Sequence, residues 1–149
     1  MAVFREDPYP AHAFLVEIHG VVEGDEIVAG FSEVSGLGVE IDVIEYRTGN
    51  EMQKAPRKLP GVPRYSNLVL KRGITGDLGL WEWIQGAVDG APLRTDGTIT
   101  LLNEEREPVL IWRFRRGWPC RYAGPGLDAD GSSVAIEELE ICHEGLAIE

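Results

Sequence analysis

Histidine and cysteine, the side chains that most often hold metals or act as nucleophiles, are few in this chain and far apart. The histidines are His12, His19 and His143, and none lies at a metal-ligand spacing from another histidine or cysteine except the neighbours Cys142 and His143. Neighbouring residues of a strand point to opposite faces, so this pair predicts no metal site. Cys120 and Cys142 lie among strand-forming residues, which favours buried free thiols, while a disulfide or a metal pair stays open.

The serine, glycine and tryptophan patterns point to no catalytic site either. Ser35 lacks the nucleophile-elbow pattern, and Gly36 and Gly38 precede a strand rather than the helix that a phosphate-binding loop requires. Trp83 falls on the apolar stripe of a helix and Trp112 alternates in a strand, so packing is their expected role rather than a sugar platform. Carboxylates are too numerous for any pair to stand out as acid and base. We therefore expect no enzyme activity and no cofactor.

Composition and charge narrow the class of protein further. The 149 residues, 44% of them hydrophobic, suit one domain spanning 1–149. The 25 acidic and 14 basic residues give a net charge of −11, which argues against a general grip on nucleic acid or on anionic membranes. No segment approaches the roughly 20 apolar residues of a membrane span. Arg5 to Pro8 fall where the apolar part of a signal peptide would begin, so we expect cytoplasmic assembly and no membrane anchoring.

Short alternating segments dominate the chain and predict a mainly β protein. Strands are expected near 12–22, 27–34, 38–47, 65–72, 97–103, 107–117 and 132–144. A single helix is expected over 77–89, with Asp77 capping its start and Gly90 closing its end. The sum is an antiparallel β-sandwich or partial barrel with one α-helix packed against it.

Two stretches break this regular pattern. Residues 48–64 form a long polar segment rich in proline, glycine and cations, and segments of this length without secondary structure are usually functional or disordered. In the last strand the apolar parity changes across Glu137 and Glu138, which predicts a β-bulge that keeps both carboxylates out of the core.

Ordered motifs along nearly the whole chain resemble one family, the inner tube proteins of contractile-tail bacteriophages and extracellular contractile injection systems. Each motif is weak alone, and the order and spacing carry the resemblance. The motifs are Asp7-Pro8-Tyr9, Phe14-Val16-Glu17-Ile18, Phe31-Ser32-Glu33-Val34-Ser35-Gly36-Leu37, Ile44-Glu45-Tyr46-Arg47 with Gly49, Lys58-Leu59-Pro60-Gly61, Leu70-Lys71-Arg72-Gly73, Leu80-Trp81 with Trp83, Trp118-Pro119, Ala135-Ile136-Glu137 and His143-Glu144-Gly145.

The resemblance implies a structural subunit that forms hexameric rings around a continuous lumenal β-barrel. The rings would stack into a rigid tube inside a sheath, and the tube would puncture a target envelope and conduct toxin or nucleic acid. Its implied partners are other copies of itself, a sheath protein, baseplate or adaptor proteins and the cargo. The finished tube would be part of a released or membrane-docked particle.

The same resemblance implies two sets of functional residues. The polar faces of the barrel strands would line the lumen through Glu17, His19, Glu40, Asp42, Glu138 and Glu140. The segment 48–64 would be an extended arm that reaches a neighbouring subunit or ring through Arg47, Lys54, Arg57, Lys58 and Arg64.

Other functions stay open at this point. An adaptor ring that joins tube to baseplate, or a secretion-system tube, would have the same fold. A monomeric β-sandwich binding module is the alternative from a different class, and it would keep an exposed aromatic platform.

Overall fold

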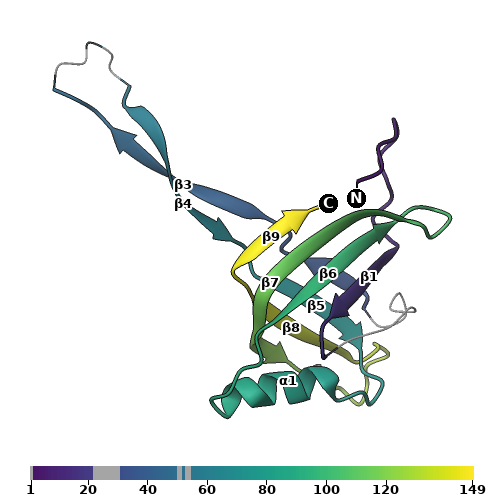
Figure 1. Ribbon diagram of the computed structural model, residues 1–149. Coiled ribbons are helices and arrows are strands. Elements are labelled where there is room, and N and C mark those ends of the chain that lie inside the picture. The colour runs from purple at the N-terminus through teal and green to yellow at the C-terminus, as the bar shows by residue number, and fades with distance from the viewer. Residues whose placement is uncertain (1, 22–30, 50–51, 53–54) are drawn as a thin grey trace.

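The computed structural model describes residues 2–21, 31–49, 52 and 55–149. Over these residues nine strands and one helix follow one another, and all strand pairs are antiparallel. The elements are β1 (Phe14–Ile18), β2 (Glu33–Ser35), β3 (Val39–Tyr46), β4 (Arg57–Tyr65), β5 (Leu68–Gly73), α1 (Gly79–Val88), β6 (Thr95–Leu102), β7 (Pro108–Ala123), β8 (Ile136–Cys142) and β9 (Gly145–Ile148). This confirms the predicted class, a mainly β protein with one helix (Figure 1).

One long strand, β7, joins the two halves of the body. Its first part pairs with β6 and β9, and its last part pairs with β8. The strand order is β1-β6-β7-β8-β5-β2, with β9 added beside β7. The sheet therefore folds over at β7 into half A (β1, β6, the start of β7, β9) and half B (the end of β7, β8, β5, β2). Gly117 lies at the fold, where an added Cβ would come within 2.7 Å of the Phe114 ring.

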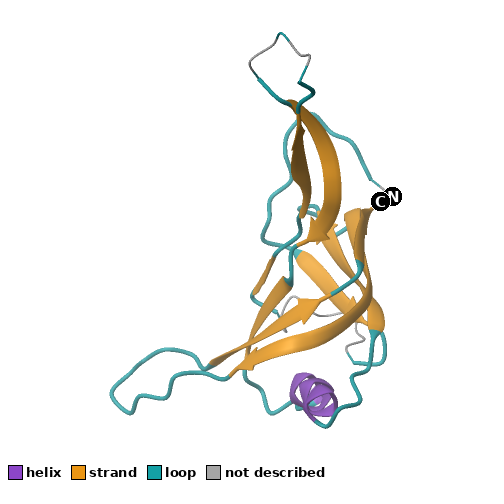
Figure 2. Ribbon diagram, turned by 90° about the vertical axis from the view of Figure 1, so that its left-hand side faces the viewer, coloured by secondary structure: helices purple, strands orange, loops and turns teal. Residues whose placement is uncertain are grey.

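The core fills the space between the two halves. Half A contributes Val16, Ile18, Ile99 and Phe114, and half B contributes Leu68, Leu70, Leu139 and Ile141, all of them buried. These residues alternate with outward-facing ones along each strand, so the period of two that predicted strands also predicted this core. Burying one such side chain contributes about 1.5–3 kcal/mol. Leu80 and Trp83 of α1 close one end of the core (Figure 2).

The helix begins two residues later than predicted. Asp77 precedes the N-cap Leu78, and its carboxylate accepts a hydrogen bond of 2.9 Å from the Gly79 N–H. It thus satisfies one free N–H of the first turn from one position further out than a capping residue. Gly90 has φ +87° just beyond the helix, which confirms the predicted glycine ending.

Several predicted strand limits were wrong. The segment 48–64 is not a loop throughout, because 57–65 is strand β4, and β9 was missed. The sequence of β4 holds two prolines and a glycine, which normally argue against a strand. In a two-stranded ribbon, however, one side of each strand needs no hydrogen-bonded partner, so prolines fit there. A register shift between Ile41 and Val43 accommodates them, and Gly61 is needed because a Cβ would lie 2.9 Å from the Asp42 carbonyl oxygen.

The predicted bulge at Glu137 and Glu138 was also wrong. β8 pairs regularly with β5 throughout, and the register shift lies in β7, between Pro119 and Arg121. Glu137 therefore points into the interior, where it is 6% exposed.

Two groups stabilise the buried Glu137 carboxylate. The Arg72 Nε donates to it at 2.5 Å, and the Tyr122 hydroxyl donates at 2.6 Å. Arg72 also reaches Asp77 at the start of α1. The hydrogen bond to Glu137 raises the pKa of Tyr122 above its ordinary value. A buried carboxylate is tolerated when it is paired and hydrogen-bonded, which is why the strand needs no bulge here.

Candidate functional site

The hairpin of β3 and β4 projects from the body. These strands form a two-stranded sheet of their own, paired from Val39 opposite Tyr65 to Tyr46 opposite Arg57. The eight residues of β3 span about 26 Å at roughly 3.3 Å per residue. Figures 1 and 2 both show the hairpin standing away from the sandwich, with α1 at the opposite end of the molecule.

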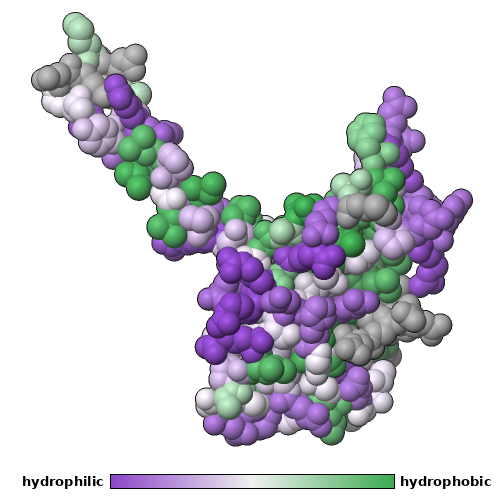
Figure 3. Space-filling view, viewed as in Figure 1, coloured by the Kyte–Doolittle hydropathy of each residue, from purple (hydrophilic) through white to green (hydrophobic). Residues whose placement is uncertain are grey.

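Large apolar side chains on this hairpin are exposed to solvent. Ile41 is 53% and Val43 62% exposed, and Ile44, Tyr46 and Val62 are exposed as well. Figure 3 shows the apolar atoms distributed along the projection. A two-stranded ribbon is marginal in water by itself, and exposed apolar patches mark interaction surfaces. The hairpin therefore has the composition of an element that is completed by another molecule.

The predicted arm cations lie on or beside this hairpin. Arg64 forms an ion pair of 3.0 Å with Asp42, and Lys58 lies opposite Glu45 in the strand register. Arg57 begins β4, and Arg47 directly follows β3. The predicted residue Lys54 lies outside the described residues. Lys58 and Arg64 of β4 thus face acidic residues of β3, which leaves the apolar side chains as the main feature of the surface.

The predicted lumen residues lie on three different surfaces. Glu138 and Glu140 share the outer face of β8 in half B, whose inner face carries Leu139 and Ile141. Glu17 lies on the outer face of half A, with His19 just beyond β1. Because the core separates the halves, these two outer faces point away from each other. The remaining pair, Glu40 and Asp42, belongs to the projecting hairpin.

The outer face of half B is charged, and its charges are locally balanced. Glu138 lies 3.7 Å from Arg121, and Lys71 lies 3.2 Å from Glu33. The Asn67 amide donates to Glu140 at 3.0 Å. This face carries the apolar strand residues Val69 and Ile136 among the charges, and the outer face of half A carries Leu15 and Ile111 beside Glu17.

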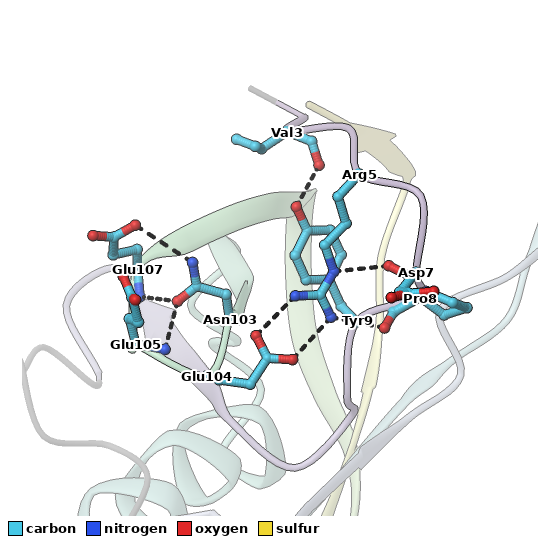
Figure 4. A network of polar contacts seen from close by, with 9 residues as sticks. All are labelled: Val3, Arg5, Asp7, Pro8, Tyr9, Asn103, Glu104, Glu105 and Glu107. Atoms are coloured by element: carbon cyan, nitrogen blue, oxygen red, sulfur yellow. Dashed lines mark hydrogen bonds and ion pairs between the residues drawn. The ribbon is translucent and has the colours of Figure 1, made fainter.

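A polar network at the start of the chain escaped the sequence reasoning (Figure 4). Arg5 donates to both oxygens of Glu104, at 2.8 and 2.9 Å, and to the carbonyls of Asp7 and Pro8. Its guanidinium lies 4.0 Å from the centre of the Tyr9 ring. The hydrogen bond from Arg5 lowers the pKa of Glu104 to about 2.

This network fixes residues 2–9 against the β6–β7 turn. Asn103 holds that turn by accepting from the N–H groups of Glu105 and Glu107. The Val3 N–H also donates to the Val109 carbonyl at 2.8 Å. The Asp7-Pro8-Tyr9 motif was the available signal, but its distant partner Glu104 has no signature in the sequence.

The cysteines are less buried than predicted. Cys120 is exposed and Cys142 half-buried, both as free thiols, because both lie on the outer face where β7 and β8 pair. Desolvation by burial is the main cause that raises the pKa of Cys120 to about 11, and it raises the pKa of Cys142 as well. A raised pKa keeps a thiol protonated at neutral pH and makes it unreactive.

The tryptophans mainly pack, as expected. Trp83 is buried, and its indole N–H donates to the Leu93 carbonyl at 2.9 Å. Trp81 is half exposed and packs edge-on against Tyr122, with 5.2 Å between the ring centres. Within the described ranges, no three histidine, cysteine or carboxylate side chains are grouped to hold a metal ion. The one described helix, of 10 residues, is too short to cross a membrane.

Solved structures of contractile machines resemble this chain over almost its full length. A chain of the PVC sheath–tube complex of an extracellular contractile injection system is 27% identical, with 97% of this chain and 93% of that chain covered and a TM-score of 0.83. A chain of the anti-feeding prophage baseplate is 26% identical, with 97% of each chain covered and a TM-score of 0.83. Hcp1 from Flavobacterium johnsoniae shares the fold at 16% identity, with 91% and 93% covered and a TM-score of 0.55.

The sequence comparison agrees with the structural one. No curated protein matches the chain. The family described as T4-like virus tail tube protein gp19 matches residues 10–147, which is nearly the whole sequence. The resemblance inferred from the ordered motifs is therefore confirmed, and the chain belongs to the T4-like virus tail tube protein family.

Proposed function

We propose that this chain is the ring-forming subunit of the inner tube of an extracellular contractile injection machine. It would assemble in the cytoplasm into stacked six-membered rings, inside a sheath and on a baseplate, and perform no catalysis. The full-length likeness to a chain of a sheath–tube complex is the observation that carries this proposal. The exposed apolar hairpin supports it, because such a surface needs a partner.

The sheet edges supply the means of closing a ring. The sheet order ends at β1 and β2, and β9 forms a further edge beside β7. Exposed edge strands pair readily with other chains, and a closed ring of identical subunits removes every such edge. We place the barrel seams at these edges.

The hairpin is the inter-subunit arm in this proposal. Burying the exposed faces of Ile41, Val43 and Ile44 against a neighbouring copy would supply affinity, at about 25 cal/mol per Å² of apolar surface. The ion pair of Arg64 with Asp42 and the facing of Lys58 and Glu45 would keep the ribbon in register. Arg47 and Arg57 lie at the ends of the strands toward the tip, and we assign them, together with the arm residue Lys54, to contacts with acidic residues of the neighbour.

The outer face of half B is the better lumen lining of the two. The two outer faces point in opposite directions, so only one of them lines a single channel. A conducting channel is best lined by charged or polar side chains, which do not bind apolar cargo. Glu138 and Glu140 lie among the charged side chains Glu33, Lys71 and Arg121, whereas Glu17 lies near Leu15 and Ile111. On this placement Glu17 and His19 face away from the channel, and Glu40 and Asp42 belong to the arm. The cargo, toxin or nucleic acid, would slide past this charged lining rather than bind.

Electron microscopy of the purified full chain at increasing concentration tests the assembly. Six-fold rings that stack into hollow tubes are expected. Ile41→Asp places a charge in the arm and should abolish the tubes, while Leu127→Asp, at a side chain 87% exposed in the β7–β8 loop, is the matched control. A chain that stays monomeric under all conditions, or tubes that tolerate Ile41→Asp, would contradict the proposal.

Thiol labelling of assembled tubes tests the lumen. In a Cys120→Ser, Cys142→Ser background, Glu138→Cys should react with a small maleimide but not with one too bulky for the channel. Glu17→Cys should react with both reagents. The reverse result would place half A at the lumen.

An adaptor ring at the baseplate is the second candidate, because the anti-feeding prophage baseplate chain matches with the same TM-score as the sheath–tube chain. Such an adaptor would form rings that do not stack by themselves. The same micrographs therefore distinguish the two.

A further inference from the structure

The ring of His143 lies at the root of the projecting hairpin, between two backbone carbonyls. Its Nδ1 is 3.1 Å from the Gly145 carbonyl oxygen, and its Nε2 is 3.0 Å from the Ser66 carbonyl oxygen. The rings of Tyr65 and Phe114 flank it, with centres 5.7 and 6.0 Å away. His143 thus connects the end of the hairpin to the turn between β8 and β9.

Two carbonyl oxygens set a requirement on the protonation of this ring. A carbonyl oxygen only accepts hydrogen bonds, so each ring nitrogen must carry a proton to bond its partner. Neutral imidazole has one N–H and imidazolium has two. Both contacts are therefore hydrogen bonds only when His143 is cationic. In the neutral ring, one nitrogen lone pair would face a carbonyl oxygen at about the same separation, and that contact would open.

Ser66 is the place where the hairpin meets the body. It lies between the end of β4 and the start of β5. Its N–H donates to the carbonyl of Gly38, in the connection between β2 and β3, at 3.1 Å. Gly36, at φ +89°, approaches so closely that a Cβ would lie 1.9 Å from the Asn67 carbonyl oxygen. Both connections of the hairpin are thus pinned together at one point, and His143 holds that point from the body side.

Several charged and titratable side chains lie near the His143 ring, on the elements that pack around it. Glu140 is held by Asn67, and Glu144 is held by Arg116, so both carboxylates already have partners. Arg115 lies across Gly145, where its Nε is 2.6 Å from the position of an added Cβ. The adjoining cavity of about 340 Å³, which Tyr65, Phe114 and Gly145 also border, adds the titratable or charged side chains His19, Asp96, Arg113 and Arg115. The two backbone carbonyls are the groups in hydrogen-bonding contact with the ring nitrogens.

We infer that His143 is a positioning residue that fixes the direction of the β3–β4 hairpin, and that its protonation tightens the hairpin root. Both hydrogen bonds are present when the ring carries two protons, and one is lost when it carries one. The consequence for assembly rests on the proposed role of the hairpin as the inter-subunit arm. The root contact itself does not.

Nuclear magnetic resonance of the ring nitrogens in the full chain, kept dilute enough to be unassembled, tests the contact without any substitution. Across a pH series, exchange of both N–H protons should be slow while the ring carries two protons, because each is then hydrogen-bonded. One of the two contacts should be lost when the ring carries one proton. Fast exchange of both N–H protons of the doubly protonated ring would overturn the inference.

Amide hydrogen exchange then measures how tightly the hairpin root is held. Protection of the Ser66 N–H, corrected for intrinsic exchange, should fall about tenfold from pH 5.5 to pH 8.5, the equivalent of one net hydrogen bond. His143→Gln, whose side chain does not change charge, should remove this dependence, while His12→Gln, at an exposed histidine far from the root, should keep it. Unchanged protection of the Ile141 amide confirms that the variants fold. Equal pH dependence in the wild type and in His143→Gln would overturn the inference.

Counting tubes at both pH values separates this inference from the proposed function. Loss of tubes at pH 8.5 in the wild type, but not in His143→Gln, links the root to assembly. A pH-dependent root with pH-independent tubes supports the positioning role and contradicts only the hairpin's part in assembly.

Discussion

The sandwich body and the β3–β4 hairpin use the same alternation of apolar and polar residues with opposite results. In β8 the alternation buries Leu139 and Ile141 completely. In β3 the same alternation leaves Ile41 and Val43 more than half exposed. Alternation therefore predicts a strand, but it does not predict whether the same chain covers the strand. An exposed apolar strand of this kind indicates a surface that binds a partner.

The buried charge of the body should give the largest effect. Glu137→Ala leaves Arg72 without its main buried partner and should lower the free energy of unfolding by about 4 kcal/mol. Asp42→Ala, which breaks the exposed pair with Arg64 in the hairpin, should cost less than about 1 kcal/mol. Urea unfolding followed by circular dichroism measures both. Equal losses would mean that the hairpin is as tightly packed as the body.

Removing apolar side chains should give the next largest difference in stability between the body and the hairpin. Leu139→Ala creates a cavity in the core and should cost about 3 kcal/mol. Val43→Ala should change the stability of the unassembled chain by less than about 0.5 kcal/mol, because its side chain is 62% exposed. In assembled tubes the difference between the stability losses of the two variants should become smaller, because assembly would bury Val43. If Val43→Ala also leaves tube stability unchanged, the hairpin face is not an interface.

Thiol reactivity compares the two regions by a third measure. The pKa of Cys120 in the body is raised to about 11, so its alkylation rate should rise about tenfold per pH unit between pH 7 and pH 10. Val43→Cys in the hairpin, with a thiol near the ordinary pKa of about 8.5, should react roughly 10-fold to 100-fold faster at pH 7. Mass spectrometry after timed alkylation gives both rates. Similar rates would show that Cys120 is not shielded.

The smallest effect should come from the exposed network at the start of the chain. The pKa of Glu104 is lowered from 4.5 to about 2, so the contact with Arg5 is complete above pH 4.5 and is lost as pH falls toward 2. Global unfolding should hardly change. Limited proteolysis near Arg5 should instead become faster at pH 2 to 3 with an acid-active protease, and Glu104→Gln should be cleaved equally fast at pH 5 and pH 3. A wild type that is equally protected at both values would contradict this role.

Local patterns were enough to predict most of the fold. The alternation located the core strands β1, β5, β6, β7 and β8, and Gly90 marked the end of the helix. Strand β4 was missed because Pro60, Gly61 and Pro63 oppose a paired strand, and only the open sides of a two-stranded ribbon tolerate them. The bulge at Glu137 was wrongly predicted because the partners Arg72 and Tyr122, which make a buried carboxylate acceptable, lie on other strands.

The candidate surfaces were predictable only in part. The segment 48–64 stood out by length and charge, yet its apolar character depends on β3, which lay outside the predicted arm. The six predicted lumen residues all alternate with apolar ones, and alternation identifies the face of a strand without relating it to the faces of other strands. That relation follows from the fold of the sheet at β7, which has no local signature.

The continuity of β7 has a mechanical consequence. Its 16 residues run from the β6 hairpin through both halves without interruption, hydrogen-bonded first to β6 and β9 and then to β8. A force along this strand loads those hydrogen bonds together in shear instead of opening them one after another. The two halves of the subunit would therefore resist such a force as one unit rather than slide past each other.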